Sequence, residues 1–255
     1  MVVALFVCAS PLAAQSEPGA HTFFTGRDGA IGAAFLAASA GLSIFDARIA
    51  RQFQDSTWAH VRIGREWDRT FSHINETTLT VGGLGVYAIA RLFGAHDVSD
   101  IAFHAAESVA AASLTAQVIR GPLGRTRPKD AAQPYEDQYE FHFLKGFAHF
   151  QQRAFPSIHS SSGFAAASAI VAEVHERAPG ATWWVGVPAY AMALTPGLSR
   201  MYLGQHWASD IFAGAFLGTF YGWRVVQYSH DHERTPVDRV FLPNHSIPLG
   251  WTLTF

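Results

Sequence analysis

The residues best suited to do chemistry lie at 199–210, where a histidine and an aspartate stand four positions apart. His206 and Asp210 begin a long apolar run typical of a helix, so both side chains are expected on one helix face. A carboxylate there can accept a hydrogen bond from one imidazole nitrogen, which fixes the tautomer and leaves the other nitrogen free as a nucleophile. Arg200 precedes the pair, and its planar guanidinium suits two phosphate oxygens. The alternative is a purely structural hydrogen bond.

A second cluster, Phe155–Ser160, contains a serine that can cap a helix. Ser157 precedes the run 160–174, and helix N-termini bind phosphate through unpaired N–H groups and a partial positive charge. His159 then stands where a general acid would protonate a leaving oxygen. The alternative is an ordinary helix cap beside a surface histidine.

The third cluster places three arginines beside glycine and proline. Arg120, Arg125 and Arg127 lie between 120 and 128, in a chain with only 18 lysines and arginines. Catalysis of phosphoryl transfer needs positioned cations, because its transition state spreads charge over three oxygens. Alternatively, the arginines cap helix carbonyls and face water.

In order and spacing, the three clusters resemble the type 2 phosphatidic acid phosphatase family, whose superfamily includes vanadium haloperoxidases and bacterial class A acid phosphatases. The family pattern is Lys-x6-Arg-Pro, then Pro-Ser-Gly-His, then Ser-Arg-x5-His-x3-Asp. The third element is complete here, as Ser199, Arg200, His206 and Asp210, and the resemblance covers roughly residues 100–225.

This resemblance implies a metal-independent phosphatase that uses a phosphohistidine intermediate. His206 would be the nucleophile with Asp210 as its partner, and His159 would be the acid for the leaving group. No cofactor and no metal are implied. The residues implied to hold the phosphate are Arg120, Arg127, Ser157, Ile158 and Arg200.

Two positions depart from the family pattern. Arg120 replaces the first lysine, which keeps the charge but changes its reach and geometry. Ile158 replaces the glycine of the second element; it retains a backbone N–H, but it disfavours positive φ and its branched side chain crowds a ligand. Reduced activity or an altered substrate is the expected consequence.

The elements that must position these residues are predicted to be helices. Six stretches rich in alanine and glycine contain few charges, and no convincing strand alternation occurs, so we expect an all-α, six-helix bundle. Small residues recur every four positions after Asp210, and Gly163 belongs to a similar set of small residues on the helix after His159. Close packing of these two helices would bring both histidines to one end of the bundle. The expected helices span roughly 30–45, 77–93, 101–119, 160–175, 181–198 and 208–228.

The N-terminus resembles an export signal. Residues 2–14 are apolar and end in small residues, so we interpret 1–14 as a signal peptide, 15–28 as a linker, 29–229 as the phosphatase domain and 230–255 as an irregular tail. Export would place the protein in the periplasm or cell envelope. The single cysteine, Cys8, excludes a disulfide framework.

The amino-acid composition limits the surroundings and the binding partners that we expect for this protein. Of the 255 residues, 49% are hydrophobic and 15% charged, and the net charge of −2 provides no basic surface for nucleic acid. Mean hydropathy is +0.10, so a soluble alanine-rich bundle and a membrane-associated one both remain open. No oligomeric state is indicated.

Further residues bear on substrate and metal binding. Aromatic side chains crowd the segment 135–155, either as packing against the bundle or as an apolar wall for a lipid or isoprenoid phosphate. His104 and Glu107 share a helix face and are interpreted as a buried polar pair, and the histidines at 230 and 232 as part of a solvated tail. Two other functions use the same pocket: a vanadate-dependent haloperoxidase, or a non-catalytic binder of phosphate or lipid headgroups.

Overall fold

The computed structural model describes residues 23–55, 62–71, 73–132, 138–232 and 236–242. Within these ranges the regular structure is helical, apart from one isolated bridge between Arg125 and Phe141. The all-α prediction is confirmed, and each of the six expected helices is present. They are α1 (Gly26–Ser43), α5 (Glu76–Leu92), α6 (His96–Leu123), α7 (Ile158–Arg177), α8 (Thr182–Tyr202) and α9 (Ala208–Asp231).

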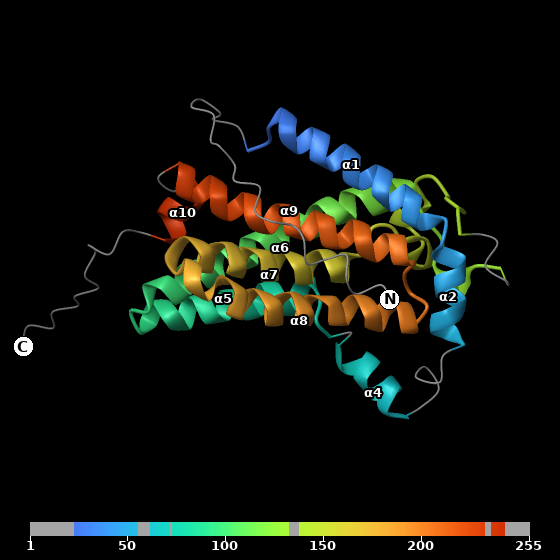
Figure 1. Ribbon diagram of the computed structural model, residues 1–255, viewed down its shortest axis with the longest axis horizontal. Helices are drawn as coiled ribbons and strands as arrows, with labels where there is room; N and C mark the ends of the chain where they lie inside the picture. The colour runs from blue at the N-terminus through green and yellow to red at the C-terminus, as the bar shows by residue number, and fades with distance from the viewer. Residues whose placement is uncertain (1–22, 56–61, 72, 133–137, 233–235, 243–255) are drawn as a thin grey trace, which may run out of the picture.

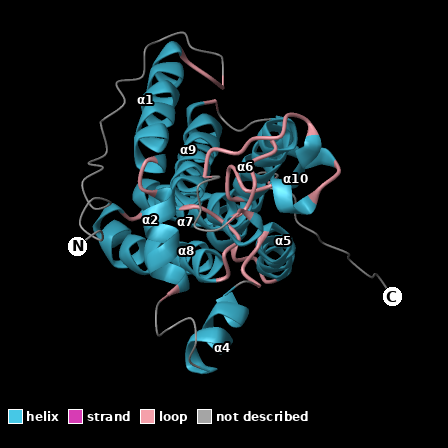
Figure 2. Cartoon of the chain, turned by 90° about the vertical axis from the view of Figure 1, so that its right-hand side faces the viewer, coloured by secondary structure: helices cyan, strands magenta, loops and turns pink. Residues whose placement is uncertain are grey.

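Helix α7 forms the centre of the bundle. It packs against α9, α6 and α8, while α5 lies against α6 and α1 against α9 (Figures 1 and 2). Most of its buried positions are alanine, serine or glycine, and many of these are fully buried, as at Ala165, Ala169 and Ser161. A central helix with such small side chains lets its neighbours approach closely.

The closest approach is the seam between α7 and α9. A Cβ added at Gly214 would lie less than 3.0 Å from the carbonyl oxygen of Ser157, and one at Gly218 equally close to that of Ser161. The row predicted from the four-residue spacing on α9 therefore does pack backbone to backbone on α7. Gly163 was expected in the same seam, but it faces α8 at Ala193 instead.

Within the described ranges, three short helices were not predicted from the sequence. They carry too many polar residues, or are too short, to show an apolar period: α2 (Asp46–Gln54), α4 (Arg62–Phe71) and α10 (Pro236–Phe241). The segment between α6 and α7 contains the 3-10 turns η2 (Pro128–Asp130), η3 (Lys145–Phe147) and η4 (Phe150–Gln152), and η5 (Pro179–Ala181) precedes α8.

The predicted boundaries need adjustment at both ends. Helix α1 begins at Gly26, inside the expected linker, and α10 lies in the part of the chain expected to be an irregular tail. Asp238 of α10 is fully buried, so this segment packs on the bundle. The expected signal peptide, 1–14, lies outside the described residues.

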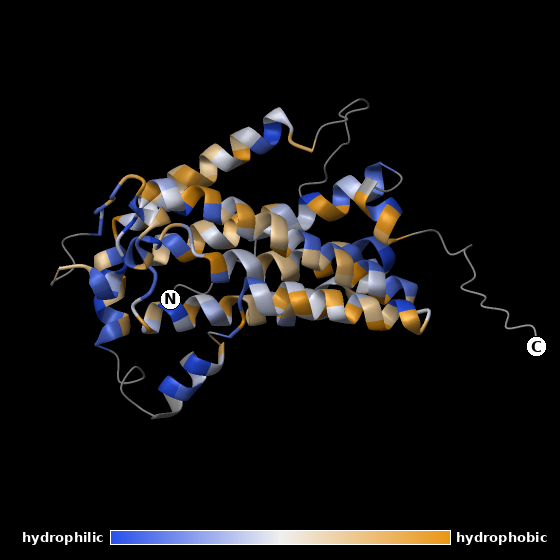
Figure 3. Ribbon diagram, turned by 180° about the vertical axis from the view of Figure 1, so that it is seen from behind, coloured by the Kyte–Doolittle hydropathy of each residue, from blue (hydrophilic) through white to orange (hydrophobic). Residues whose placement is uncertain are grey.

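Many large apolar side chains are exposed. Hydrophobic residues recur along the long helices of the bundle (Figure 3). Among the described helices, none taken singly has the length and apolar character of a membrane span; α1 and α2 together pass on length and composition, with a 58° bend between them. The exposed apolar residues include Leu36, Val81, Ile89, Leu114, Val118, Trp183, Trp184 and Val187.

Candidate active site

The three predicted clusters meet at one end of the bundle. This end contains the C-terminus of α6, the N-termini of α7 and α9, and the C-terminus of α8 (Figure 1). The Ser157 N–H donates to the Asp210 carbonyl at 3.0 Å, which joins the starts of α7 and α9 directly. His159 lies within electrostatic reach of Arg200, His206 and Arg120. The structure therefore brings together side chains from segments far apart in the sequence.

His206 is buried and held by a backbone carbonyl. Its Nδ1 lies 2.7 Å from the carbonyl oxygen of Ala154. Because a carbonyl only accepts hydrogen bonds, Nδ1 carries the proton and Nε2 keeps its lone pair. The histidine is thus in the tautomer that a nucleophile needs.

Asp210 makes a different contact from the one expected. Its Oδ2 lies 3.7 Å from His206 Nδ1, too far for a hydrogen bond. Instead, Oδ2 accepts the Trp207 N–H at 2.8 Å and Oδ1 accepts Arg125 Nη1 at 2.6 Å. Asp210 therefore influences His206 through its charge and by fixing the start of α9, while Ala154 orients the ring.

Arg125 is the centre of a buried network that the sequence did not indicate. Its Nη2 donates to Asp46 Oδ2 at 2.8 Å, so one guanidinium bridges the carboxylates of α2 and α9. The Ser209 hydroxyl oxygen accepts a hydrogen bond from Arg125 Nη1 at 2.8 Å, and the Ser209 backbone N–H donates to Asp46 Oδ1 at 2.9 Å. Burial raises the pKa of both Asp46 and Asp210, and the charge of Arg125 opposes this shift.

The electrostatic environment keeps both histidines neutral. Burial, followed by the charges of Arg127 and Arg200, lowers the pKa of His206 well below its usual value. Burial, followed by the charge of Arg200, lowers the pKa of His159 to about 2. Burial and neighbouring arginine charges lower the pKa of Arg127 to about 10, so this side chain still carries its charge at neutral pH.

Several donors at this end lack hydrogen-bond partners within the described residues. They are the Nε–H groups of Arg120, Arg127 and Arg200, with His159 Nδ1 as a fourth buried polar atom. A buried polar group without a partner costs about 1–3 kcal/mol. A tetrahedral oxyanion offers several acceptor oxygens and would satisfy them together.

Ser157 and Ile158 form the start of α7. Ser157 is the N-cap and its Oγ accepts the Ser160 N–H at 3.4 Å. Ile158 is the first helical residue and is buried, and it is not among the described residues with positive φ. The backbone here therefore does not require the conformational freedom of a glycine.

Glu76 is a second residue that the sequence analysis missed. It lies at the N-terminus of α5. Burial lowers the pKa values of Arg120 and Arg200, and the negative charge of Glu76 opposes this shift. One carboxylate oxygen, Oε2, is buried without a hydrogen-bond partner in the described structure. The only local signal was the helix-capping Asn75, which does not reveal what Glu76 faces.

The aromatic segment packs on the C-terminus of α6, where the Phe147 ring lies against Gly121, but several of its rings remain largely exposed. Phe143 and Phe147 are 76% and 60% exposed, and the Arg127 guanidinium lies 3.8 Å from the centre of the half-exposed Phe150 ring. Tyr135 of the same segment lies outside the described residues. An apolar, aromatic surface thus borders the cluster of arginines.

The fold and site define a helical bundle with an arginine-lined anion site beside a neutral, oriented histidine. The profile of the PAP2 superfamily matches residues 101–234, which include all three clusters, and the chain belongs to that superfamily.

Two individual relatives are similar in sequence to parts of this chain. A lipid A 4'-phosphatase of Bacteroides thetaiotaomicron (strain VPI-5482) is 29% identical over 113 residues, which cover 44% of this chain and 46% of that protein. A lipid A 1-phosphatase of Porphyromonas gingivalis is 36% identical over 69 residues, 27% of this chain and 15% of the relative. The matched segments thus cover less than half of each relative.

A solved structure has the same fold. It is the transmembrane PAP2-type phosphatidylglycerolphosphate phosphatase from Bacillus subtilis, which aligns with 80% of this chain and 96% of its own at 20% identity, with a TM-score of 0.53. The structural similarity therefore covers most of the helical bundle and not the site alone.

Proposed function

We propose that this chain is a phosphatase that hydrolyses the phosphate groups of lipid or isoprenoid molecules through a phosphohistidine at His206. The observation that carries the proposal is the set of partnerless Nε–H donors of Arg120, Arg127 and Arg200 around a neutral histidine. The positive charges of three guanidiniums match the negative charge that develops on a phosphoryl group in the transition state of its transfer.

The reaction would proceed in two displacements. His206 Nε2 attacks phosphorus, the bond to the substrate oxygen breaks, and that oxygen takes a proton from His159. His159 then removes a proton from water, the water oxygen attacks phosphorus, and the bond to Nε2 breaks to release phosphate. His159 is neutral before substrate binds, so the negative charge of the substrate itself must raise its pKa for the first step.

The aromatic surface supports a lipid substrate. Tyr139, Phe141 and Phe143 are about half exposed or more, beside a site for anions. Both curated relatives are named as lipid A phosphatases, which agrees with a phosphate carried on hydrocarbon chains. Each buried methylene would contribute up to about 0.8 kcal/mol, so kcat/KM should rise along a series of alkyl phosphates and then level off.

We place the protein in the cell envelope, in contact with a membrane. The apolar first residues support export, and the exposed apolar side chains of α1, α5 and α8 support contact with lipid. A lipid substrate would then reach the site from the membrane surface.

The test is phosphate release by the purified full-length chain from lipid phosphates, isoprenyl diphosphates and soluble monoesters. His206→Ala should abolish turnover, and His175→Ala, at the far end of α7, should not change it.

Because arginines provide the charge clamp, EDTA should leave initial rates at 25 °C unchanged and vanadate should inhibit them. Activity that survives His206→Ala, or that needs a divalent ion, contradicts the mechanism; halide oxidation with vanadate would identify a haloperoxidase.

A further inference from the structure

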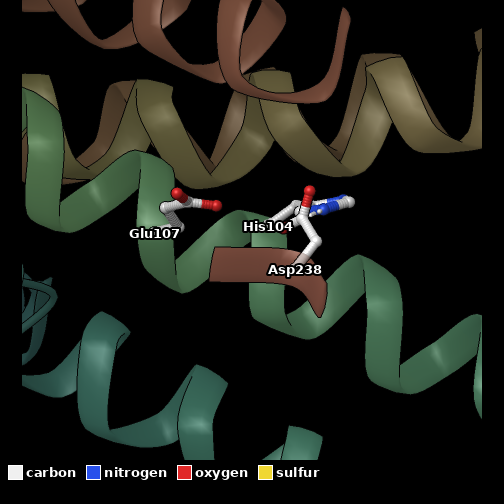
Figure 4. Close-up of side chains that lie close together, drawn as sticks. All are labelled: His104, Glu107 and Asp238. Atoms are coloured by element: carbon white, nitrogen blue, oxygen red, sulfur yellow. Dashed lines mark hydrogen bonds and ion pairs between the residues drawn. The ribbon is translucent and has the colours of Figure 1, made fainter. Parts of the chain in front are cut away.

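A second buried cluster of ionisable side chains lies at the opposite end of the bundle. His104 and Glu107 are on α6 and Asp238 is on α10, and one ligand atom from each lies within 4.8 Å of the others (Figure 4). At a rise of about 1.5 Å per residue, His104 is about 24 Å along α6 from Arg120. The cluster is therefore separate from the proposed phosphatase site.

His104 is oriented by a carboxylate behind it. Its Nδ1 makes a short contact with Glu173 of α7, and Glu173 is itself held by Arg177 Nη2 at 3.0 Å and by His230 Nε2 at 3.3 Å. Histidines that bind metals typically donate the other ring N–H to such a carboxylate, which directs the free nitrogen to the ion.

The remaining nitrogen faces two more carboxylates. His104 Nε2 lies 3.3 Å from Asp238 Oδ1. Ligands bound about 2.0–2.2 Å from a tetrahedral ion lie about 3.3–3.6 Å from one another, so this separation fits a shared ion. Glu107 points into the same space (Figure 4).

Glu107 is the member of the cluster whose charge is not balanced. In the described part of the chain its carboxylate makes no ion pair, whereas Arg177 is already shared by Glu173, Asp100 and Asp97. Two carboxylates that share a buried site repel each other, and either a proton on one of them or a cation between them removes the repulsion. A divalent ion that took the place of the proton between His104 Nε2 and Asp238 would also lie beside the carboxylate of Glu107.

We propose that His104, Glu107 and Asp238 bind a divalent transition-metal ion of the zinc class, which fastens α10 to α6. One imidazole and two carboxylates suit zinc, and water would complete the four ligands. The role is structural, because the ion would join two helices far from the reacting phosphate. It requires nothing from the proposed phosphatase activity.

The test uses the purified full-length chain after treatment with a chelator. Dialysis against micromolar zinc should load one tightly bound ion per chain, and zinc should raise the thermal unfolding temperature by several degrees. Glu107→Gln should weaken this binding at least tenfold and remove the thermal shift. Glu176→Gln, an exposed glutamate on α7, is the matched control and should behave as the wild type.

A comparison of the metal-free wild type with metal-free Glu107→Gln distinguishes a metal site from a simple hydrogen-bond network. Without an ion, Glu107→Gln relieves repulsion from Asp238, so it should unfold at the same or a higher temperature than the metal-free wild type. If zinc then stabilises the wild type and Glu107→Gln equally, or stabilises neither, the site does not exist. In that case a proton shared between His104 and Asp238 occupies the place of the ion.

Discussion

At the scale of single residues, the proposed site depends on histidines that are kept uncharged by their neighbours. His206 is already in a reactive form, because Ala154 fixes its proton on Nδ1. His159 is neutral for the same electrostatic reasons, and this is the wrong state for an acid. The binding of a phosphate dianion would supply the missing negative charge, so the acid would form only when substrate is present.

Replacement of His159 should therefore affect substrates according to their leaving groups. An alkoxide needs a proton as it departs, whereas a nitrophenolate does not. His159→Ala should slow alkyl phosphates by about 10²- to 10⁴-fold, and p-nitrophenyl phosphate much less. Steady-state kinetics on both substrates would show the difference, and equal losses on the two would mean that His159 does not act as the acid.

The sequence predicted the types of residue at the site better than their contacts. His159, His206 and the arginines could be named from motif spacing, and the structure places them together. The Asp46–Arg125–Asp210 network could not be named, because its members come from three segments and no local pattern links them. The expected Asp210–His206 hydrogen bond failed because Asp210, at the start of α9, is committed to Trp207 and Arg125.

At the scale of elements, α7, which contains His159, and α9, which begins just after His206, are held together by a seam of small residues. Gly218→Ala would place a methyl group less than 3.0 Å from the backbone of α7, so the helices must move apart. We expect a loss of several kcal/mol in the free energy of unfolding and reduced activity. Gly85→Ala on α5 is the control: its added Cβ meets nothing within 4 Å, and alanine should stabilise that helix by up to about 1 kcal/mol.

Denaturant unfolding and phosphate release on the two glycine variants provide the comparison. If Gly218→Ala proves as stable and as active as Gly85→Ala, the seam does not control the spacing of the histidines.

Helix α2 is connected to the site through charge as well as through the apolar packing of Ala50 against Ala154 and Trp207. Asp46→Asn removes one of the two carboxylates that share Arg125, and breaking a buried ion pair typically costs about 3–5 kcal/mol. We expect a loss in this range by denaturant unfolding. Asp55→Asn, at the exposed end of the same helix, should change stability by less than about 0.5 kcal/mol. Equal effects of the two substitutions would contradict the bridging role of Arg125.

Long apolar helices were predictable because their composition reveals them without any knowledge of their neighbours. The short helices were not: α4 is mostly polar, and α10 is a six-residue helix that begins at Pro236 in a region without apolar periodicity. Such elements form because they have a specific partner, as when Asp238 of α10 meets His104 of α6. A pattern read along one segment does not contain that partner.

At the scale of the whole molecule, the neutral histidines should make stability depend on pH. His159 has a folded pKa below its unfolded value of about 6.5, so the unfolded chain binds more protons in acid. Its contribution is fully present above pH 6.5 and is lost as the pH falls. Between pH 6.5 and 5, the wild type should lose up to about 1.4 kcal/mol per pH unit more than His159→Gln.

The measurement is the free energy of unfolding at several pH values, with and without phosphate. Bound phosphate should flatten the wild-type dependence, because the anion offsets the arginine charges. Identical slopes for the wild type and His159→Gln would show that His159 is not held neutral in the folded protein.

The seam between α7 and α9 also has a consequence for how this protein can diverge. The backbones of α7 and α9 meet at the seam. A few small residues therefore set the separation of the two histidines, and the large side chains of the surface do not. The outer faces of α1, α5 and α8 are then free to change with the surroundings of each descendant. Sequence drift should therefore be fast on these faces and slow along Gly214, Gly218 and Gly222, whichever substrate a lineage acquires.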